Sequence, residues 1–152
     1  SSAASDVYKR QGMNNFYLYR LEGRTRFFFI PWDESHAFQS PTYSIWHNIF
    51  DVPDPLRNRL MQRVLGQADL FARYLDMLEL AAASANEPTA PDGRGWLARE
   101  IEREYAQIRT SALSDTKKPF TNEEFEAGVA DLLRFAATRG AFVAGQVASA
   151  RQ

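Results

Sequence analysis

Two short apolar runs, separated by a polar turn, constrain the fold of this chain more than any other feature. The runs lie in residues 14–20 and 27–33, and Glu22-Gly23 between them is typical of a turn. Runs of this length that are rich in aromatic side chains are typical of β-strands. We therefore predict an antiparallel hairpin. Both of its faces are largely apolar, so we expect both to be covered, one of them by helices of this chain.

Side chains that carry oxygen ligands lie at the open end of the predicted hairpin. The position of the turn predicts that Asn15 faces Ile30 and that Gly12 faces Asp33. The amide of Asn15 and the carboxylate of Asp33 would then converge at that end. Enzymes that transfer phosphoryl groups hold magnesium with oxygen ligands of this kind. We therefore predict a magnesium site formed by Asp33 and Asn15.

The same residues resemble the motifs of a known family. Residues 15–19 read N-F-Y-L-Y, residues 31–33 read P-W-D, and Phe38 follows shortly after. This combination resembles the spore coat protein H (CotH) kinase family, a family of atypical protein kinases. The resemblance implies that Asp33 is the magnesium-binding aspartate and that Asn15 is a second metal ligand. Both residues would then belong to the site that binds ATP and Mg²⁺.

The resemblance also implies an activity and a location. The activity is that of a kinase-type phosphotransferase, which moves the γ-phosphate of ATP to hydroxyl groups of a protein substrate, with coat or secreted proteins as candidate substrates. The implied location is the spore coat, the cell envelope or the secreted fraction of a bacterium. The expected fold class is α+β and mostly α, with a short β-hairpin followed by about five helices, similar to the C-terminal lobe of a kinase.

Three positions depart from the family pattern. Many relatives have Asp or Asn two residues after the aspartate, where this chain has Ser35, and Gln39 replaces the glycine after the family phenylalanine. The catalytic aspartate of the family lies about eight residues before the asparagine, where this chain has Val7. Ser35 and Gln39 favour an alternative function, a non-catalytic pseudokinase or a structural module of a coat or secreted assembly. A generic helical interaction domain is a third interpretation, which leaves the two motifs unexplained.

The start of the chain offers a reason for the missing aspartate. Ser1–Gln11 matches the in-frame translation of a widely used transposase sequencing adapter, so we expect it to be non-native. We therefore predict two segments, residues 1–11 derived from the adapter and residues 12–152 forming the C-terminal part of a CotH-like kinase domain. The catalytic aspartate is then expected upstream, and the chain as given is expected to be inactive.

Each candidate ligand also has a purely structural interpretation. Asp33 could end a strand by accepting backbone hydrogen bonds, and Asn15 could be an edge-strand or turn residue. His36 is better explained as a local hydrogen-bond partner, because magnesium prefers oxygen ligands. His47 lies among apolar residues, and we predict that it is packed and hydrogen-bonded.

Composition excludes several functional classes. The formal net charge of −1 at pH 7 gives no electrostatic case for binding nucleic acid or an anionic membrane. No apolar run approaches the ~18 residues of a membrane span. The chain has no cysteine, so disulfides and thiol catalysis are excluded. A hydrophobic fraction of 45% is typical of a globular core.

The rest of the chain has the periodicity and the boundary residues of helices. We predict five helices with these limits: from Asp54-Pro55 to Gly66, from about Ala68 to Ser84, after the linker 86–95, from Thr121, and after an interruption at Arg139-Gly140. Thr121 with Glu124 predicts a capping box at the start of the fourth of these helices.

Overall fold

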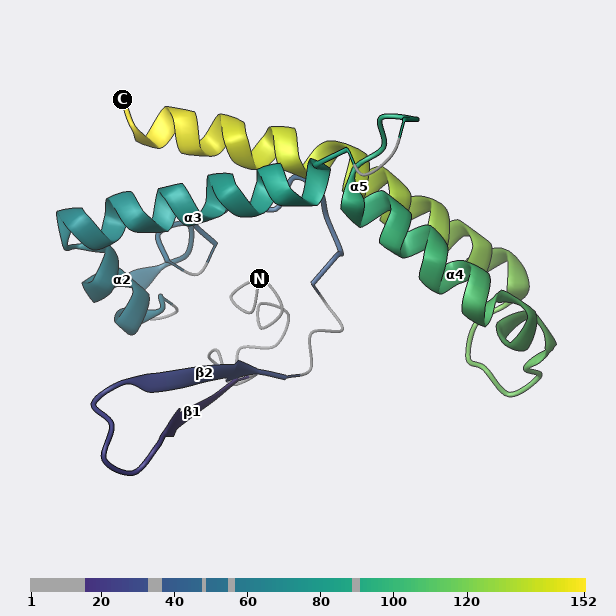
Figure 1. Cartoon of the computed structure of the whole chain (residues 1–152), viewed down its shortest axis with the longest axis horizontal. Coiled ribbons are helices and arrows are strands. Elements are labelled where there is room, and N and C mark those ends of the chain that lie inside the picture. The colour runs from purple at the N-terminus through teal and green to yellow at the C-terminus, as the bar shows by residue number, and fades with distance from the viewer. Residues whose placement is uncertain (1–15, 33–36, 48, 55–56, 89–90) are drawn as a thin grey trace. The chain divides into compact units, whose positions relative to one another are not determined.

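The computed structural model describes residues 16–32, 37–47, 49–54, 57–88 and 91–152 (Figure 1). The chain forms two compact units, and their boundary falls inside a helix, after Tyr74. The described part contains a two-stranded hairpin and four helices: β1 (Phe16–Arg20), β2 (Phe27–Pro31), α2 (Arg59–Leu65), α3 (Ala68–Asn86), α4 (Trp96–Ser114) and α5 (Asn122–Ala150). The predicted α+β, mostly α fold class is therefore confirmed.

The hairpin forms as predicted, but its register differs by two residues. Ile30 pairs with Tyr17 and not with Asn15, so the predicted pairing was wrong. The backbone N–H of Arg24 donates to the carbonyl of Leu21 at 3.1 Å, and Gly23 takes a φ of 72° inside this turn. Further loop residues then precede β2, which begins only at Phe27. The loop is therefore longer than the tight turn from which the register was predicted.

A shift of two residues leaves every side chain on its predicted face, because side chains alternate along a strand. Phe16 and Phe29 stack on one face with their ring centroids 4.8 Å apart. Tyr17 and Trp32 stack across the other face at 5.9 Å. The large apolar side chains of both faces are exposed by 46–61%, namely those of Tyr17, Leu18, Tyr19, Phe27, Phe28, Phe29, Ile30 and Trp32. The helices of the first unit leave both faces exposed, and cover of one face by other helices of this chain stays a prediction.

The first unit has a small aromatic core. Ile49 is 1% exposed, and the indole of Trp46 stacks on the ring of Phe71 with centroids 5.8 Å apart. The hydroxyl of Tyr74 donates to the carbonyl of Ile45 at 2.9 Å. These contacts attach the segment 43–50 to the first half of α3.

The start of α2 lies later than the sequence predicted. Asn58 is the N-cap, and its side-chain oxygen accepts from the backbone N–H of Met61 at 3.1 Å. The carboxylate of Asp54, the predicted cap, instead forms a salt bridge with Arg59 at 2.5 Å. Asp54 is thus occupied by an ion pair, and Asn58 satisfies the first turn of the helix.

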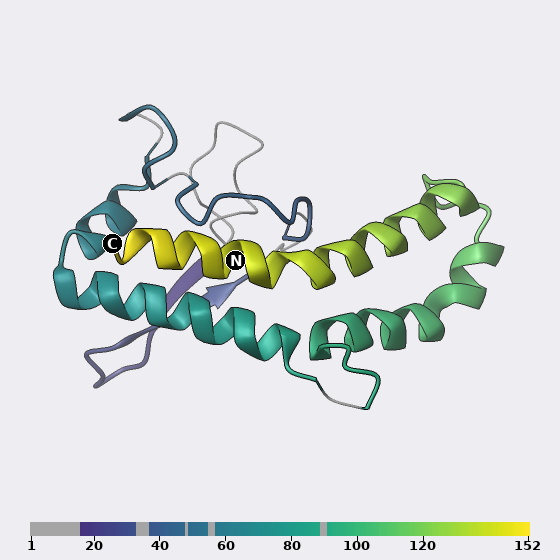
Figure 2. The same cartoon turned by 90° about the horizontal axis from the view of Figure 1, so that it is seen from above.

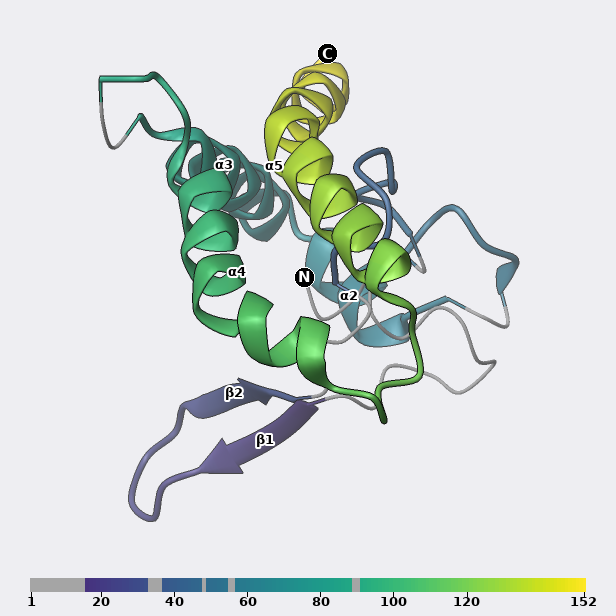
Figure 3. The same cartoon turned by 90° about the vertical axis from the view of Figure 1, so that its right-hand side faces the viewer.

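In the second unit, α4 packs antiparallel against the first part of α5 (Figure 3). The part of α3 after Tyr74 lies along the last part of α5, so α3 and α4 follow one another beside a single long helix (Figure 2). Leu75 and Val147 are each 2% exposed. The guanidinium of Arg151 contacts Asp76 at 2.7 Å and therefore connects the end of α5 to α3.

Helix α5 begins as predicted but does not break where predicted. The hydroxyl of Thr121 accepts from the N–H of Glu124 at 3.1 Å, and the carboxylate of Glu124 accepts from the N–H of Thr121 at 2.8 Å, which confirms the capping box. The interruption predicted at Arg139-Gly140 is absent, because α5 runs without a break to Ala150. Gly140 is buried at this point and faces Asn86, so its role is to make room for a neighbouring side chain.

None of the described helices is both long and apolar enough to cross a membrane.

Candidate functional site

In the sequence, the predicted magnesium ligand Asn15 directly precedes β1, and the other ligand, Asp33, comes two residues after the end of β2. Asn15 and Asp33 themselves lie outside the described residues. Phe16, the residue after Asn15, pairs with Pro31, which is two residues before Asp33. A carboxylate and an amide oxygen are donors of the kind that magnesium prefers.

Aromatic stacking stabilises this end of the hairpin. Phe16 stacks on Phe29 at 4.8 Å, and Tyr17 stacks on Trp32 at 5.9 Å. Such ring pairs contribute roughly 0.5–1.5 kcal/mol beyond their buried area. Trp32, whose ring makes the second of these contacts, is the last described residue before Asp33.

No group of three or more His, Asp or Glu side chains that could hold a metal is present among the described residues. Asp33 and Asn15 lie outside these residues, and the predicted metal site therefore stays a prediction. His36 and Ser35 also lie outside the described part of the chain.

Comparison with known proteins identifies the family. A family model described as "CotH kinase protein" matches residues 2–143. The chain belongs to the CotH kinase family. The resemblance carried by N-F-Y-L-Y and P-W-D is thereby confirmed. Neither the curated proteins nor the solved structures gave a match. The matched range includes residues 2–11, whose origin in an adapter stays a prediction.

Membership of the CotH kinase family indicates a kinase-like function and implies a protein substrate. The family name is also linked with the spore coat.

His47 of this CotH kinase chain is packed, as predicted, but one of its ring nitrogens has no hydrogen-bond partner among the described residues. Its ring lies 4.5 Å from the ring of Tyr43. Its Nε2 atom is buried and has no hydrogen-bond partner among the described residues, so the prediction of a satisfied histidine was wrong for this atom. Burial lowers the pKa of His47 from its ordinary value, and the charge of Asp51 opposes that shift. A half-buried imidazole of this kind serves packing.

Asp92, in the linker between α3 and α4, is committed to ion pairs. Asp92 accepts from Nε of Arg94 at 2.8 Å and also binds the guanidinium of Arg99. The hydrogen bonds from Arg94 and then Arg99 lower the pKa of Asp92 to about 2. Asp92 is therefore an anionic, paired residue that connects the linker to the start of α4.

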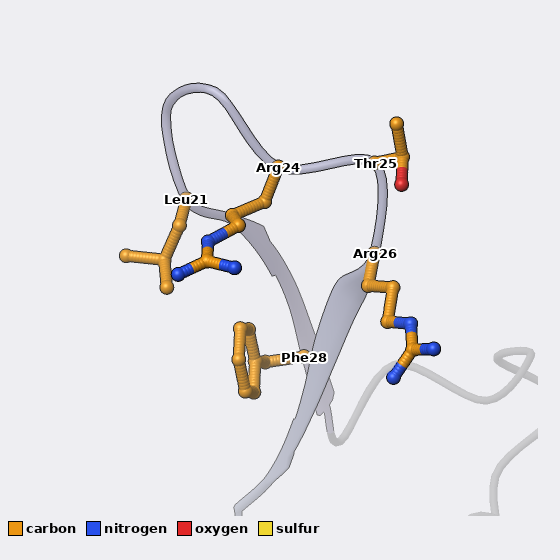
Figure 4. Close-up of a pocket in the computed structure, with 5 residues that line it drawn as sticks. All are labelled: Leu21, Arg24, Thr25, Arg26 and Phe28. Atoms are coloured by element: carbon orange, nitrogen blue, oxygen red, sulfur yellow. The ribbon is translucent and has the colours of Figure 1, made fainter.

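The loop of the hairpin contains a feature that the sequence analysis missed. A hollow of about 530 Å³ is lined by Leu21, Arg24, Thr25, Arg26 and Phe28 (Figure 4). Leu21, Arg24 and Phe28 gather on one side of the loop, and Arg26 extends away from them. The alternation of charged and apolar residues at 20–28 is visible in the sequence, but the hollow depends on the longer loop that shifted the register.

Proposed function

We propose that this chain carries the magnesium-holding part of a CotH-type protein kinase, which transfers the γ-phosphate of ATP to hydroxyl groups of a protein substrate. Asp33 and Asn15 are the proposed ligands of the metal. The pairing of Phe16 with Pro31 is the observation that carries this proposal, because it joins the described residues of the two family motifs, N-F-Y-L-Y and P-W-D. The family match over residues 2–143 supports the reaction class.

The roles of the residues follow from what phosphoryl transfer requires. Magnesium, when bound with ATP, neutralises the charge that develops on the phosphate oxygens. The carboxylate of Asp33 and the amide oxygen of Asn15 would hold and orient the metal–nucleotide complex, and the stacked Trp32 would limit the movement of Asp33. Catalysis of this type depends on positioning and electrostatics and needs little covalent chemistry from the protein.

Calorimetric titration of the chain with ATP in the presence of Mg²⁺ tests the two ligands without needing turnover. We expect Asp33→Asn to weaken binding by about tenfold or more, equivalent to at least ~1.4 kcal/mol. Glu22→Gln is the matched control, because it removes a carboxylate from the loop at the opposite end of the same hairpin. Equal affinities for the wild type and the Asp33 variant would contradict the proposed site.

The second candidate function is a non-catalytic pseudokinase or a structural module of a coat or secreted assembly. It is favoured by Ser35 and Gln39, which replace residues typical of the family. Sequencing the source DNA upstream of Gly12 separates the two functions. An aspartate about eight residues before Asn15 supports the kinase, and any other residue there supports the pseudokinase.

A further inference from the structure

The loop of the hairpin concentrates positive charge on a chain that is slightly acidic overall. The stretch 20–26 contains three arginines, Arg20, Arg24 and Arg26, and only one acidic residue, Glu22. The whole chain has a formal net charge of −1. We call the surface formed by residues 20–28 the hairpin tip.

The arginines of the hairpin tip differ from most arginines of the helical units in their interaction partners. Most arginines of the helical units, including their linkers, form salt bridges with carboxylates: Arg59, Arg94, Arg99, Arg103, Arg109, Arg134 and Arg151. Within the described part of the chain, the guanidinium groups of Arg24 and Arg26 have no hydrogen bond or salt bridge. That of Arg20 lies over the ring of Phe27 at 6.0 Å. Arg24 and Arg26 therefore keep their donors available for an external acid.

Apolar surface and open backbone accompany these charges. Leu21 is 42% exposed and Phe28 is 52% exposed, and both line the hollow with Arg24 and Arg26 (Figure 4). The described sheet has only two strands, so each strand has an outer edge. Such an edge can pair with an extended peptide, whose backbone supplies affinity and whose side chains supply specificity.

We infer that the hairpin tip binds an extended, acidic segment of a partner protein. The carboxylates of that segment would bind Arg24 and Arg26, and its apolar side chains would contact Leu21 and Phe28. Three cations on a chain of net negative charge favour such a segment over nucleic acid, whose binding depends on many phosphate contacts. This inference is independent of the metal site, because the tip lies at the other end of the hairpin from the ladder end next to Asp33.

Fluorescence anisotropy with labelled peptides tests the inference on the full chain. The probe alternates glutamate with valine, and a matched probe has glutamine in place of glutamate. We expect the acidic probe to bind and the Arg24→Gln/Arg26→Gln variant to bind it about tenfold more weakly. The matched variant is Arg63→Gln/Arg73→Gln, which removes the same charge from two exposed helical arginines and should retain affinity within about twofold.

Circular dichroism of both variants checks that they are folded, which we expect because all four arginines are exposed. The inference is overturned if the acidic probe does not bind, if the glutamine probe binds equally well, or if the two double variants lose the same affinity. It is also overturned if a single-stranded oligonucleotide or an anionic vesicle binds more tightly than the peptide and with the same dependence on Arg24 and Arg26.

Discussion

Replacing Gly140 with alanine should destabilise the second unit, although alanine is the better helix former. A Cβ atom at this position would lie 1.7 Å from Nδ2 and 2.9 Å from Cγ of Asn86, so the Asn86 side chain must move. Movement breaks the hydrogen bond that Nδ2 donates to the carbonyl of Ala82 at 2.8 Å, worth about 1 kcal/mol. Overpacking adds about 1–3 kcal/mol, and helix propensity returns about 1 kcal/mol. The expected net loss is therefore about 1–3 kcal/mol.

Gly145→Ala is the matched control, because it is the same substitution in the same helix and its Cβ would meet nothing within 4 Å. We expect it to stabilise the chain by about 1 kcal/mol through helix propensity alone. Urea unfolding followed by far-ultraviolet circular dichroism measures both effects. Asn86→Ala combined with Gly140→Ala should recover part of the loss. Equal stabilisation by the two glycine substitutions would refute the reasoning.

Two further predictions concern His47 and Thr121. Burial lowers the folded-state pKa of His47 below its ordinary 6.5, so the unfolded chain binds the proton more readily. The contribution of His47 to the free energy of unfolding should therefore be fully present above pH 6.5 and decrease as the pH falls toward the folded-state pKa. The unfolding midpoint measured across this pH range should depend less on pH in His47→Gln than in the wild type, and an unchanged pH dependence would contradict the assignment. Thr121→Ala removes the cap of α5 and should cost about 1 kcal/mol in the same unfolding assay, whereas Thr121→Ser should cost little.

Features encoded within a few residues could be predicted from the sequence. The capping box of Thr121 and Glu124 requires only residues three apart, and it formed as predicted. The hairpin and the side chains on each of its faces follow from alternation, which a shift of two residues does not change. The predicted start of α2 was wrong because Asp54 and Asn58 are both good N-caps. The ion pair from Asp54 to Arg59 decides between them.

Features that depend on distant residues could not be predicted. Gly140 has the local signature of a helix end, and only its contact with Asn86, far away in the sequence, explains why α5 continues. The hollow of the hairpin tip likewise depends on the conformation of the loop and not on a motif. The candidate metal ligands, Asn15 and Asp33, were proposed from a family motif, and they lie outside the described residues, so their role stays a prediction.

The end-to-end placement of α3 and α4 along α5 has a consequence for how this family can vary in length. Helix α5 is the common partner of α3 and α4. The packing faces of its two halves must therefore keep a fixed rotation, relative to each other, about the helix axis. Inserting or deleting a single residue in the middle of α5 turns everything beyond it by about 100° and removes one half from its partner. The linker 87–95 carries no such constraint, because its ends can be joined by loops of different length. We therefore expect length variation among relatives to accumulate in the linker and to be absent from the middle of α5.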